Sequence, residues 1–408
     1  MKVLILTQFY SPEPGLMLQQ LAQKLHAFGH AVTVLTGFPN YPAGTLYPGY
    51  RVRFCQREML AGVPVVRVPL YPEHSRSGLL RVFNYLSFAL SSAILGPWLI
   101  KRPHVVFVYH PPLTIGLPAY VLSRFWHVPF VYQIQDMWPE TLRATGMLQN
   151  PGLLRLVSRF AQWIYKKAQI ILVISPGFRR NLIEKGVSSR KIRVISNWID
   201  PNIYYPQDPD PKLAEKLGLD KRFNIIYAGN MGEGQGLETV LESAILLSDL
   251  PEVQFVFIGD GIALPRLRQF VEERKIDNIR FLGRYPYHAM QDLYALADVL
   301  LIHLKDDPLF RITIPSKTLA YMATGKPILA AGNGDISDLI TKVGAGITCP
   351  PGNGRALAAS VRQLFSMSAD ERRNMGKQGR QAASNQYSKD VVIAEIEKEL
   401  RRAASVGN

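Results

Sequence analysis

The sequence predicts an α/β protein with two domains, each built on a parallel β-sheet. Short apolar segments typical of buried strands alternate with helical segments, and this alternation stops and then restarts. The break lies at residues 200–210, a proline-rich stretch that is typical of a linker. The chain has 408 residues, of which 47% are apolar and 19% charged, which is enough for two globular cores.

The first half opens with a strand–helix–strand pattern, which predicts a parallel sheet. Its first elements are two strands around a helix, and a third strand after a long loop: 2–7, 16–28, 31–36 and 63–69. Gly15, where the first loop meets the helix, would let the backbone approach a ligand, although an ordinary helix-entry glycine explains it equally well. The long loop runs from Gly37 to about Arg57 and contains Asn40. Loops of this length in compact domains are usually functional or disordered.

Residues 79–100 form an apolar segment in which Arg81 is the only charge. Its length resembles a membrane span, but a strand at 105–109 follows at once and continues the sheet pattern, which argues against a span. The apolar residues at helical spacing form one stripe: Leu79, Phe83, Leu86, Leu90 and Ile94. Two interpretations stay open, a helix buried in the domain and a helix lying in a membrane interface. In the second, the membrane-facing residues are Arg81, Phe83, Leu86 and Leu90.

Polar side chains follow two of the predicted strands in this half. His110 comes after the strand at 105–109, and Gln135 and Asp136 come after the strand at 129–134. Ligands of open parallel sheets bind beyond the carboxyl ends of the strands. A single His or Asp at such an end is more often structural than catalytic, but two strand ends with polar groups favour a site.

The second half restarts with a strand, a glycine-rich loop and a helix. The loop runs from Gly229 to Gly236, and the next strand ends at another glycine-rich turn, which contains Asp260. Spaced glycines between a strand and a helix are typical of a phosphate cradle. The pattern departs from G-x-G-x-x-G, so a dinucleotide, a nucleotide diphosphate and a simple tight turn all remain possible.

A second candidate anion site lies around Lys317. A buried strand at 299–304 precedes it, and Pro315 and Ser316 fit the first turn of a helix in which the serine hydroxyl can cap. Lys317 lies in the same turn, where a cation opposes the helix dipole. Its position makes sense if an anion binds at the helix amino end. An ordinary strand–helix unit with a surface lysine explains the pattern about as well.

The charge distribution narrows the choice of partner. Residues 1–200 hold 22 Lys and Arg against 7 Asp and Glu, a net charge of +15, and the remaining 25 basic and 25 acidic residues cancel. A basic half beside a neutral half indicates an anionic partner for the first half: a nucleic acid, an acidic membrane or a phosphorylated substrate. Without zinc-finger spacing or an aromatic–basic RNA motif, we expect no nucleic acid. The distant Cys55 and Cys349 predict a reducing compartment and no metal, and the opening strand predicts no signal peptide.

The order of these motifs resembles glycosyltransferase family 4, the retaining enzymes of the GT-B fold, over nearly the whole chain. The segment from Ile174 to Asn197 is similar to the family's domain-closing segment, and 229–236 is similar to its donor phosphate loop. Pro315-Ser316-Lys317 with 321–327 resembles its most specific signature. Residues 37–42 and 135–140 are similar to a narrower branch that builds O-antigen, capsule and colanic acid and includes amino-fucosyl transferases.

The sequence departs from the family pattern at several site positions. Two glutamates with seven residues between them are replaced by Ile312 and Ala320, which puts ribose recognition in doubt. An Arg and a Lys of the phosphate loop are replaced by Asn230 and Gln235. The acceptor-side His is replaced by Gln135. The main cations left for the diphosphate are Lys317 and Arg311.

The resemblance implies a GT-B enzyme with two Rossmann-like domains facing across a cleft. Residues 1–200 would bind the acceptor, 201–385 the nucleotide-sugar donor, and the helix at 386–408 would pack back on the first domain. Lys317 and Asp136 are the expected catalytic residues. The expected donor-site residues are Gly15, Gly229, Asn230, Gly232, Gln235, Gly236, Asp260, Arg284, Tyr285, Arg311, Ser316, Lys317 and Thr318. On the acceptor side we expect His110, Gln135, Asp136 and Asn40.

The implied reaction moves a sugar, such as the amino-deoxy sugar N-acetyl-fucosamine, from a UDP-sugar to a lipid-diphosphate-linked sugar. It needs no cofactor or metal. The enzyme would be cytoplasmic and peripheral on the anionic inner face of the membrane. Two alternatives stay open, an NAD-dependent enzyme with Asp260 on the ribose and a non-catalytic partner at the membrane surface.

Overall fold

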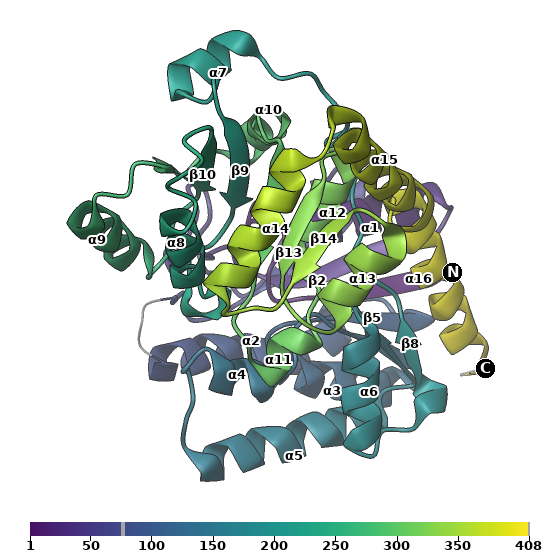
Figure 1. Ribbon diagram of the computed structural model, residues 1–408. Helices are drawn as coiled ribbons and strands as arrows, with labels where there is room; N and C mark the ends of the chain where they lie inside the picture. The colour runs from purple at the N-terminus through teal and green to yellow at the C-terminus, as the bar shows by residue number, and fades with distance from the viewer. Residues whose placement is uncertain (75–77, 407–408) are drawn as a thin grey trace. The chain divides into compact units, whose positions relative to one another are not determined.

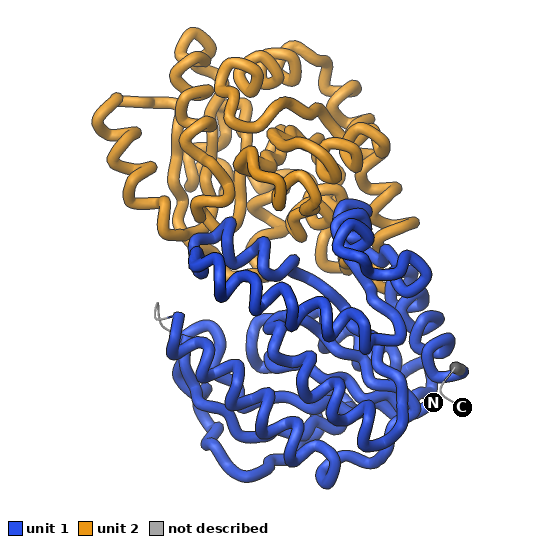
Figure 2. The backbone as a smooth tube through the Cα atoms, turned by 90° about the horizontal axis from the view of Figure 1, so that it is seen from below, with its two compact units in different colours: residues 1–196, 390–408 blue, residues 197–389 orange. Residues whose placement is uncertain are grey.

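The structure, a computed structural model, describes residues 1–74 and 78–406 and confirms an α/β protein with two parallel-sheet domains. The chain forms two compact units, Met1–Ser196 with Asp390–Asn408 and Asn197–Lys389, which Figure 2 colours separately. Each unit contains one sheet. The assignment of acceptor and donor roles to the two halves stays a prediction.

The first unit is built on an eight-stranded sheet in the order β3-β4-β2-β1-β5-β6-β7-β8. The strands are β1 (Lys2–Leu6), β2 (Ala31–Gly37), β3 (Gln56–Leu60), β4 (Val63–Val68), β5 (Val105–His110), β6 (Phe130–Ile134), β7 (Ile170–Val173) and β8 (Ile192–Val194). The helices are α1 (Leu16–Ala27), α2 (Gly78–Leu99), α3 (Gly116–Trp126), α4 (Glu140–Ala144), α5 (Pro151–Lys167), α6 (Pro176–Glu184) and α16 (Lys389–Val406). Figure 1 labels most of these elements. Every strand pair is parallel except β3 with β4.

Strand β3 corrects one sequence prediction, because the long loop ends at Cys55 and not at about Arg57. Residues 56–60 pair antiparallel with β4 at the edge of the sheet, with Arg57 opposite Val66. Side chains of β3 alternate between half-buried and exposed. A short edge strand of this composition, in which three of five residues are polar, has no apolar run that would reveal it.

The second unit has a six-stranded, fully parallel sheet in the order β11-β10-β9-β12-β13-β14. Its strands are β9 (Phe223–Ala228), β10 (Val253–Ile258), β11 (Ile279–Gly283), β12 (Val299–His303), β13 (Ile328–Ala331) and β14 (Gly346–Cys349). Its helices are α7 (Pro211–Leu217), α8 (Glu238–Ile245), α9 (Leu264–Arg274), α10 (Met290–Ala295), α11 (Pro308–Arg311), α12 (Lys317–Ala323), α13 (Asp335–Val343), α14 (Gly354–Ser366) and α15 (Ala369–Gln386).

Two apolar cores cover the two faces of this second sheet. Alternate residues of β9 belong to different cores, with Ile226 and Ala228 in one and Ile225 and Tyr227 in the other. All six residues of β9 are therefore buried, as is typical of a parallel sheet with helices on both faces. This burial explains why the central strands are mostly apolar in the sequence, without a polar residue at every second position.

The carboxyl-terminal helix α16 packs within the first unit through charged contacts. Glu397 accepts from His30 at 2.8 Å, and the Lys24 ammonium lies 2.8 Å from the carboxylate of Asp390. Arg193 lies 3.4 Å from Glu399. The chain thus returns to its first unit after completing the second.

Candidate functional site

The glycine-rich loop and Lys317 meet at the carboxyl end of β9. The Lys317 Nζ atom lies 3.8 Å from the centre of the Tyr227 ring, in the geometry of a cation–π contact. A Cβ atom on Gly229 would lie 2.9 Å from the same Nζ, and Gly229 has a φ of +135°. The backbone conformation therefore favours glycine at this position, and a larger side chain would displace the Lys317 ammonium. Two separately predicted anion-binding features form one place in the fold.

Lys317 is half-buried, which corrects the expectation of an exposed surface lysine. Burial lowers the pKa of Lys317 from 10.5 to about 7, because removal from water disfavours the charged form. An anion placed beside Nζ would reverse this effect by stabilising the ammonium. A strongly lowered lysine pKa beside a glycine-rich loop is typical of a functional site.

The start of α12 also differs from the sequence prediction. Regular α-helix begins at Lys317, and the Ser316 side chain makes no capping hydrogen bond. The preceding turn is closed by backbone bonds from Thr318 to Pro315 and from Leu319 to Ser316. Ser316 is exposed, while the Thr318 hydroxyl is buried and has no hydrogen-bond partner in the described part of the chain.

The loop at 229–236 is held in shape mainly by its own groups. The Gln235 side-chain oxygen accepts from the Gly232 N–H at 3.1 Å, so this amide shapes the turn. The Tyr227 hydroxyl donates to the Asn230 carbonyl oxygen at 2.6 Å. The glycine-rich turn after β10, which contains Gly259 and Asp260, packs against this loop. A Cβ on Gly259 would lie 2.1 Å from the Gly229 oxygen. The Asp260 carboxylate accepts from the Gly261 N–H at 2.7 Å and is exposed.

Arg311 is not a free cation. Its Nε and Nη2 atoms both donate to Asp306 Oδ1, at 3.1 and 3.0 Å, on an exposed part of the surface. Arg284 is exposed just beyond β11, and Tyr285 is half-buried against the core. Of the predicted cations, Lys317 is the one that the structure places against the glycine loop.

A cavity of about 500 Å³ lies beside this loop within the second unit. Its wall includes His303, Lys305, Glu238 and Gly236, none of which except Gly236 the sequence singled out. His303 ends β12, and its Nδ1 atom lies 2.6 Å from the Gln235 carbonyl oxygen. Burial lowers the pKa of His303. Its position at a strand end, the criterion applied to His110, is the signal that would have found it.

Another cavity of the second unit, about 430 Å³, lies at the opposite ends of the strands. It is lined by Asp298, which precedes β12, by Lys326, which precedes β13, and by Arg372. These are the amino ends of the strands, where open parallel sheets do not bind their substrates. We therefore assign the candidate site to the glycine loop and Lys317.

In the first unit, His110 and Asp136 lie at the carboxyl ends of β5 and β6. His110 is fully buried, and neither ring nitrogen has a hydrogen-bond partner within residues 1–74 and 78–406. Burial lowers the pKa of His110 to about 3, so the imidazole is neutral. Its ring packs at 5.7 Å, centre to centre, against Trp138. Asp136 and Gln135 are half-buried, and burial raises the pKa of Asp136.

Asn40 has an internal role. Its backbone N–H and that of Tyr41 donate to Glu13 Oε1, each at 2.8 Å, and its side chain donates to the Phe38 oxygen at 2.9 Å. The other Glu13 oxygen accepts from the Tyr10 N–H at 3.0 Å. Glu13, which sequence reasoning did not select, therefore fastens the loops after β1 and β2 to each other. Gly15 follows it with a φ of +156° at the start of α1.

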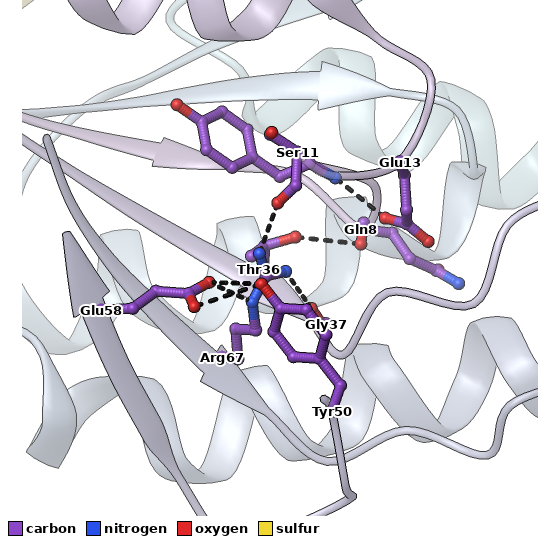
Figure 3. A network of polar contacts seen from close by, with 9 residues as sticks. Gln8, Ser11, Glu13, Thr36, Gly37, Tyr50, Glu58 and Arg67 are labelled. Carbon is purple, nitrogen blue, oxygen red and sulfur yellow. Dashed lines mark hydrogen bonds and ion pairs between the residues drawn. The ribbon is translucent and has the colours of Figure 1, made fainter. Parts of the chain in front are cut away.

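Arg67 reinforces the same corner of the first unit (Figure 3). The side chain is fully buried in β4, and its Nε atom donates to Glu58 at 2.6 Å. Its other nitrogens donate to the carbonyl oxygens of Gly37 and Ser11. The guanidinium also lies 4.9 Å from the centre of the Tyr50 ring. Arg67 therefore joins the loop after β1, the end of β2, the long loop at Tyr50 and strand β3, which its sequence context gave no reason to expect.

The stripe on α2 is exposed, so the buried-helix interpretation is wrong for these residues. The exposed fractions are 69% for Leu79, 55% for Phe83, 41% for Leu86, 52% for Leu90 and 63% for Ile94. The opposite side of the helix is buried and includes Asn84, Phe88 and Ser92. Among the described helices, α2 is long and apolar enough to cross a membrane, judged by length and composition, and 22% of its most apolar window is buried.

Arg81 does not share this outward face, which corrects its prediction as a membrane-facing residue. The side chain is half-buried, and its Nε atom is shielded from solvent.

In the described residues no group of His, Cys, Asp and Glu side chains could hold a metal ion.

Two family profiles match the chain. The first, described as a glycosyl transferase 4-like domain, matches residues 14–198, and the second, glycosyl transferases group 1, matches residues 210–382. WcaI of Escherichia coli (strain K12), whose name assigns it to colanic acid biosynthesis as a glycosyl transferase, is 29% identical over 380 residues, covering 90% of this chain and 92% of WcaI. WbjE of Pseudomonas aeruginosa, named as a glycosyltransferase, is 30% identical over 286 residues, 69% of each chain.

Solved structures share the fold. HepE of Anabaena (Alr3699), crystallised with UDP, superposes with a TM-score of 0.75 at 18% identity, over 98% of this chain and 100% of that one. Sucrose-phosphate synthase from Thermosynechococcus elongatus superposes with a TM-score of 0.74 at 16% identity, over 99% of each chain. At these identities the likeness concerns the fold.

Proposed function

Because the chain belongs to glycosyltransferase family 4 and is an enzyme of the GT-B type, we propose that it transfers a sugar from a UDP-sugar to a lipid-diphosphate-linked sugar during surface polysaccharide synthesis. Family membership sets aside the NAD-dependent and non-catalytic alternatives. The observation that carries the proposal is the meeting of Lys317, Gly229 and Tyr227 at the carboxyl end of β9.

Lys317 has the properties of a group that stabilises a leaving diphosphate. In the reaction, the bond between the anomeric carbon and the diphosphate oxygen breaks, and negative charge grows on that oxygen. A nearby ammonium and loop amides stabilise this charge more strongly in a site shielded from water. The lowered pKa of Lys317 shows that its site disfavours the isolated cation, and the diphosphate would supply the missing counter-charge.

The acceptor hydroxyl supplies the new bond to the anomeric carbon and gives up its proton. With retention, the acceptor attacks from the face that the diphosphate leaves, and a diphosphate oxygen can take the proton. Asp136, half-buried at the end of β6 in the basic unit, would orient the acceptor hydroxyl. Its raised pKa agrees with a carboxyl group that is shielded from water.

Two observations support the identity of the substrates. HepE, which shares the fold over nearly the whole chain, was crystallised with UDP and with UDP-glucose, which favours a UDP-sugar donor. The likeness to WcaI favours an acceptor in surface polysaccharide synthesis. An amino-deoxy donor sugar such as N-acetyl-fucosamine rests on the motifs at 37–42 and 135–140 alone.

The exposed face of α2 supports a membrane-bound acceptor. Trp98, 79% exposed at the end of the helix, contacts Phe125 of α3 at 6.0 Å between ring centres and extends the apolar surface. Exposed cations adjoin this end of α2: Arg57, which donates to the Leu99 oxygen, and Lys101, Arg102 and Arg124. An apolar face bordered by cations favours peripheral binding to an anionic bilayer. We propose that the enzyme binds the cytoplasmic face, so that the lipid of its acceptor stays in the membrane.

The donor is tested by thermal shift of the purified protein with UDP, GDP, ADP and NAD. We expect UDP to raise the melting temperature most, because binding to the folded state alone stabilises it. Transfer of labelled sugar to a membrane extract should then require the matching UDP-sugar. Stabilisation by another nucleotide with no effect of UDP would contradict the proposed donor.

A further inference from the structure

We propose that Arg81 binds the diphosphate of the lipid-linked acceptor, at the amino end of α2 and within the first unit. The inference rests on the proposed function, since it names the group by which that acceptor is recognised. Arg81 would lie where the sugar meets the lipid: on one side the aromatic residues near Asp136, on the other the exposed apolar stripe of α2.

Among the described residues, the Nε atom of Arg81 has no hydrogen-bond partner. In the part of the chain that the structure describes, its Nε atom is shielded from solvent without a hydrogen bond, and the side chain forms no ion pair. A donor that is shielded from water and has no acceptor costs free energy, and a ligand that accepts its hydrogen bond would remove this cost. A planar guanidinium with five N–H donors matches the paired oxygens of a phosphate group.

The acidic groups near this corner do not fill that role. Glu13 already accepts three backbone N–H groups. Burial, the largest effect, and the charge of Arg81 both lower the pKa of His74, and the neighbouring Glu73 raises it. Glu73 has an interaction of its own, and none of the ion pairs found among residues 1–74 and 78–406 joins Glu73 to Arg81. The positive charge of Arg81 is therefore available to a ligand.

Aromatic rings lead from Arg81 toward the predicted acceptor residues. Tyr85 lies one turn after Arg81 on the same side of α2, and the Arg81 charge acts against burial to lower the pKa of Tyr85. The Tyr85 ring lies 6.5 Å from that of Trp138, which packs against His110. The half-buried rings of Tyr85 and Trp138, the latter two residues from Asp136 in sequence, are suited to hold the acceptor sugar.

A second aromatic group lies near Arg81, whose charge also acts on His74. The Tyr41 ring is 4.7 Å from His74 and 5.1 Å from Phe9, and all three side chains are half-buried or close to it. Tyr41 acts on the pKa of Tyr85, so the two groups are neighbours. Arg81 thus lies among rings that carry no compensating negative charge.

The arrangement on α2 separates the two ends of the acceptor. Phe83, Leu86 and Leu90 face solvent, while Arg81 and Tyr85 lie on the partly buried side of the same helix. One helix can therefore contact the lipid tail with one face and the head group with the other. A soluble sugar acceptor would make use of neither feature.

The test uses farnesyl diphosphate and farnesyl monophosphate as short-chain probes, with the full-length protein in saturating UDP. UDP occupies the donor site, so any diphosphate that still binds does so elsewhere. Calorimetry should show that the wild type binds the diphosphate at least tenfold more tightly than the monophosphate. The Arg81→Gln variant should lose this preference, and Arg81→Lys, which lacks the planar fork, should lose at least threefold of it.

The matched control is Arg190→Gln, which changes an exposed arginine of the same unit. This variant should bind both probes like the wild type. The melting temperature of Arg81→Gln should be no lower than that of the wild type, since no partner is lost. An unchanged preference in Arg81→Gln overturns the inference. If Arg81→Gln does not fold, an unchanged preference in Arg81→Lys overturns it instead.

The outcome separates this inference from the proposed function. If the protein transfers sugar from a UDP-sugar but does not distinguish the two probes, the proposed function stands and the role of Arg81 falls. If diphosphate binding depends on Arg81 but UDP neither binds nor supports transfer, the site stands and the proposed function falls.

Discussion

The Nζ atom of Lys317 lies 3.8 Å from the centre of the Tyr227 ring, with Gly229 beside it, so a residue at the start of α12 is held against the end of β9. The ring face offers the ammonium a weak electrostatic partner. A diphosphate would be a far stronger one. The same contact fixes the position of the lysine before any substrate arrives, which is the condition for electrostatic catalysis.

Replacing Lys317 with alanine should reduce turnover at least 100-fold, since the loss of one preorganised electrostatic donor typically costs about 3 kcal/mol. Steady-state kinetics with the identified UDP-sugar measures this. Because Lys317 is half-buried over Tyr227, Lys317→Ala also removes packing. Lys317→Met, which keeps most of the stem, provides the control for folding. Turnover near the wild-type value in a folded Lys317→Met variant would show that the lysine is not catalytic.

The pKa of Lys317 predicts how UDP affinity depends on pH. Burial lowers it to about 7 in the free protein, so the ammonium is lost as the pH rises through 7. UDP should therefore bind most tightly below pH 7 and progressively more weakly up to pH 9, as measured by calorimetry. In Lys317→Arg the cation persists over this range, so the weakening should be much smaller. An identical pH dependence in both proteins would assign the effect to another group.

The lowered pKa of Lys317 also makes the free energy of unfolding depend on pH. The unfolded chain, with a lysine pKa near 10.5, binds more protons at this residue than the folded chain between pH 7 and 10.5. Stability without nucleotide should therefore gain from Lys317 as the pH rises through this window. In Lys317→Met that contribution disappears, so the stability of the variant relative to the wild type should fall between pH 7 and 9. Urea unfolding at several pH values measures it.

Asp136 is expected to act on the acceptor and not on the nucleotide. Asp136→Asn should lose transfer activity while UDP affinity stays unchanged, because the residue lies at the end of β6 in the first unit and the candidate donor site lies in the second. Calorimetry with UDP and a transfer assay separate the two effects. A comparable loss of UDP affinity would instead place Asp136 in donor binding or in the fold.

The sequence predicted the fold well because its central strands carry their own signal. All residues of β9, β10 and β12 are buried, and each strand is apolar except for one polar residue, Asn224, Gln254 or His303. Strand β3 was missed because an edge strand buries little and its residues are largely polar. The strand periodicity that reveals a half-buried strand is too short in five residues to stand out.

The candidate site was predicted only in part, since much of it depends on tertiary contacts. The glycine loop and Lys317 were recognised separately, but burial of the lysine follows from its contact with Tyr227, 90 residues earlier in the chain. Gln235 looks like a ligand in the sequence, yet its side chain bonds to Gly232. Arg81 was grouped with the membrane-facing residues of 79–100, whereas helical spacing places it one turn from the half-buried Tyr85.

The exposed stripe of α2 predicts reversible, salt-sensitive membrane binding. Replacing Phe83, Leu86 and Leu90 with serine should abolish co-sedimentation with anionic liposomes, because these side chains are 41–55% exposed and supply apolar area to the bilayer interface. The folded core should be little affected, since none of the three is buried. Leu153→Ser with Leu156→Ser, at exposed positions on α5, provides a matched apolar control that should still bind.

The cations at the end of α2 make the same binding depend on charge. Each Lys or Arg near an anionic bilayer contributes about 1 kcal/mol, an effect that salt screens within about 10 Å at 0.1 M. Lys101→Gln with Arg102→Gln, both exposed just after α2, should therefore weaken binding at low salt and matter less at high salt. Neutral liposomes should bind poorly in every case. Equal amounts of wild-type protein in the supernatant with anionic and neutral vesicles, at both salt concentrations, would rule out the membrane role of α2 and would favour a soluble acceptor.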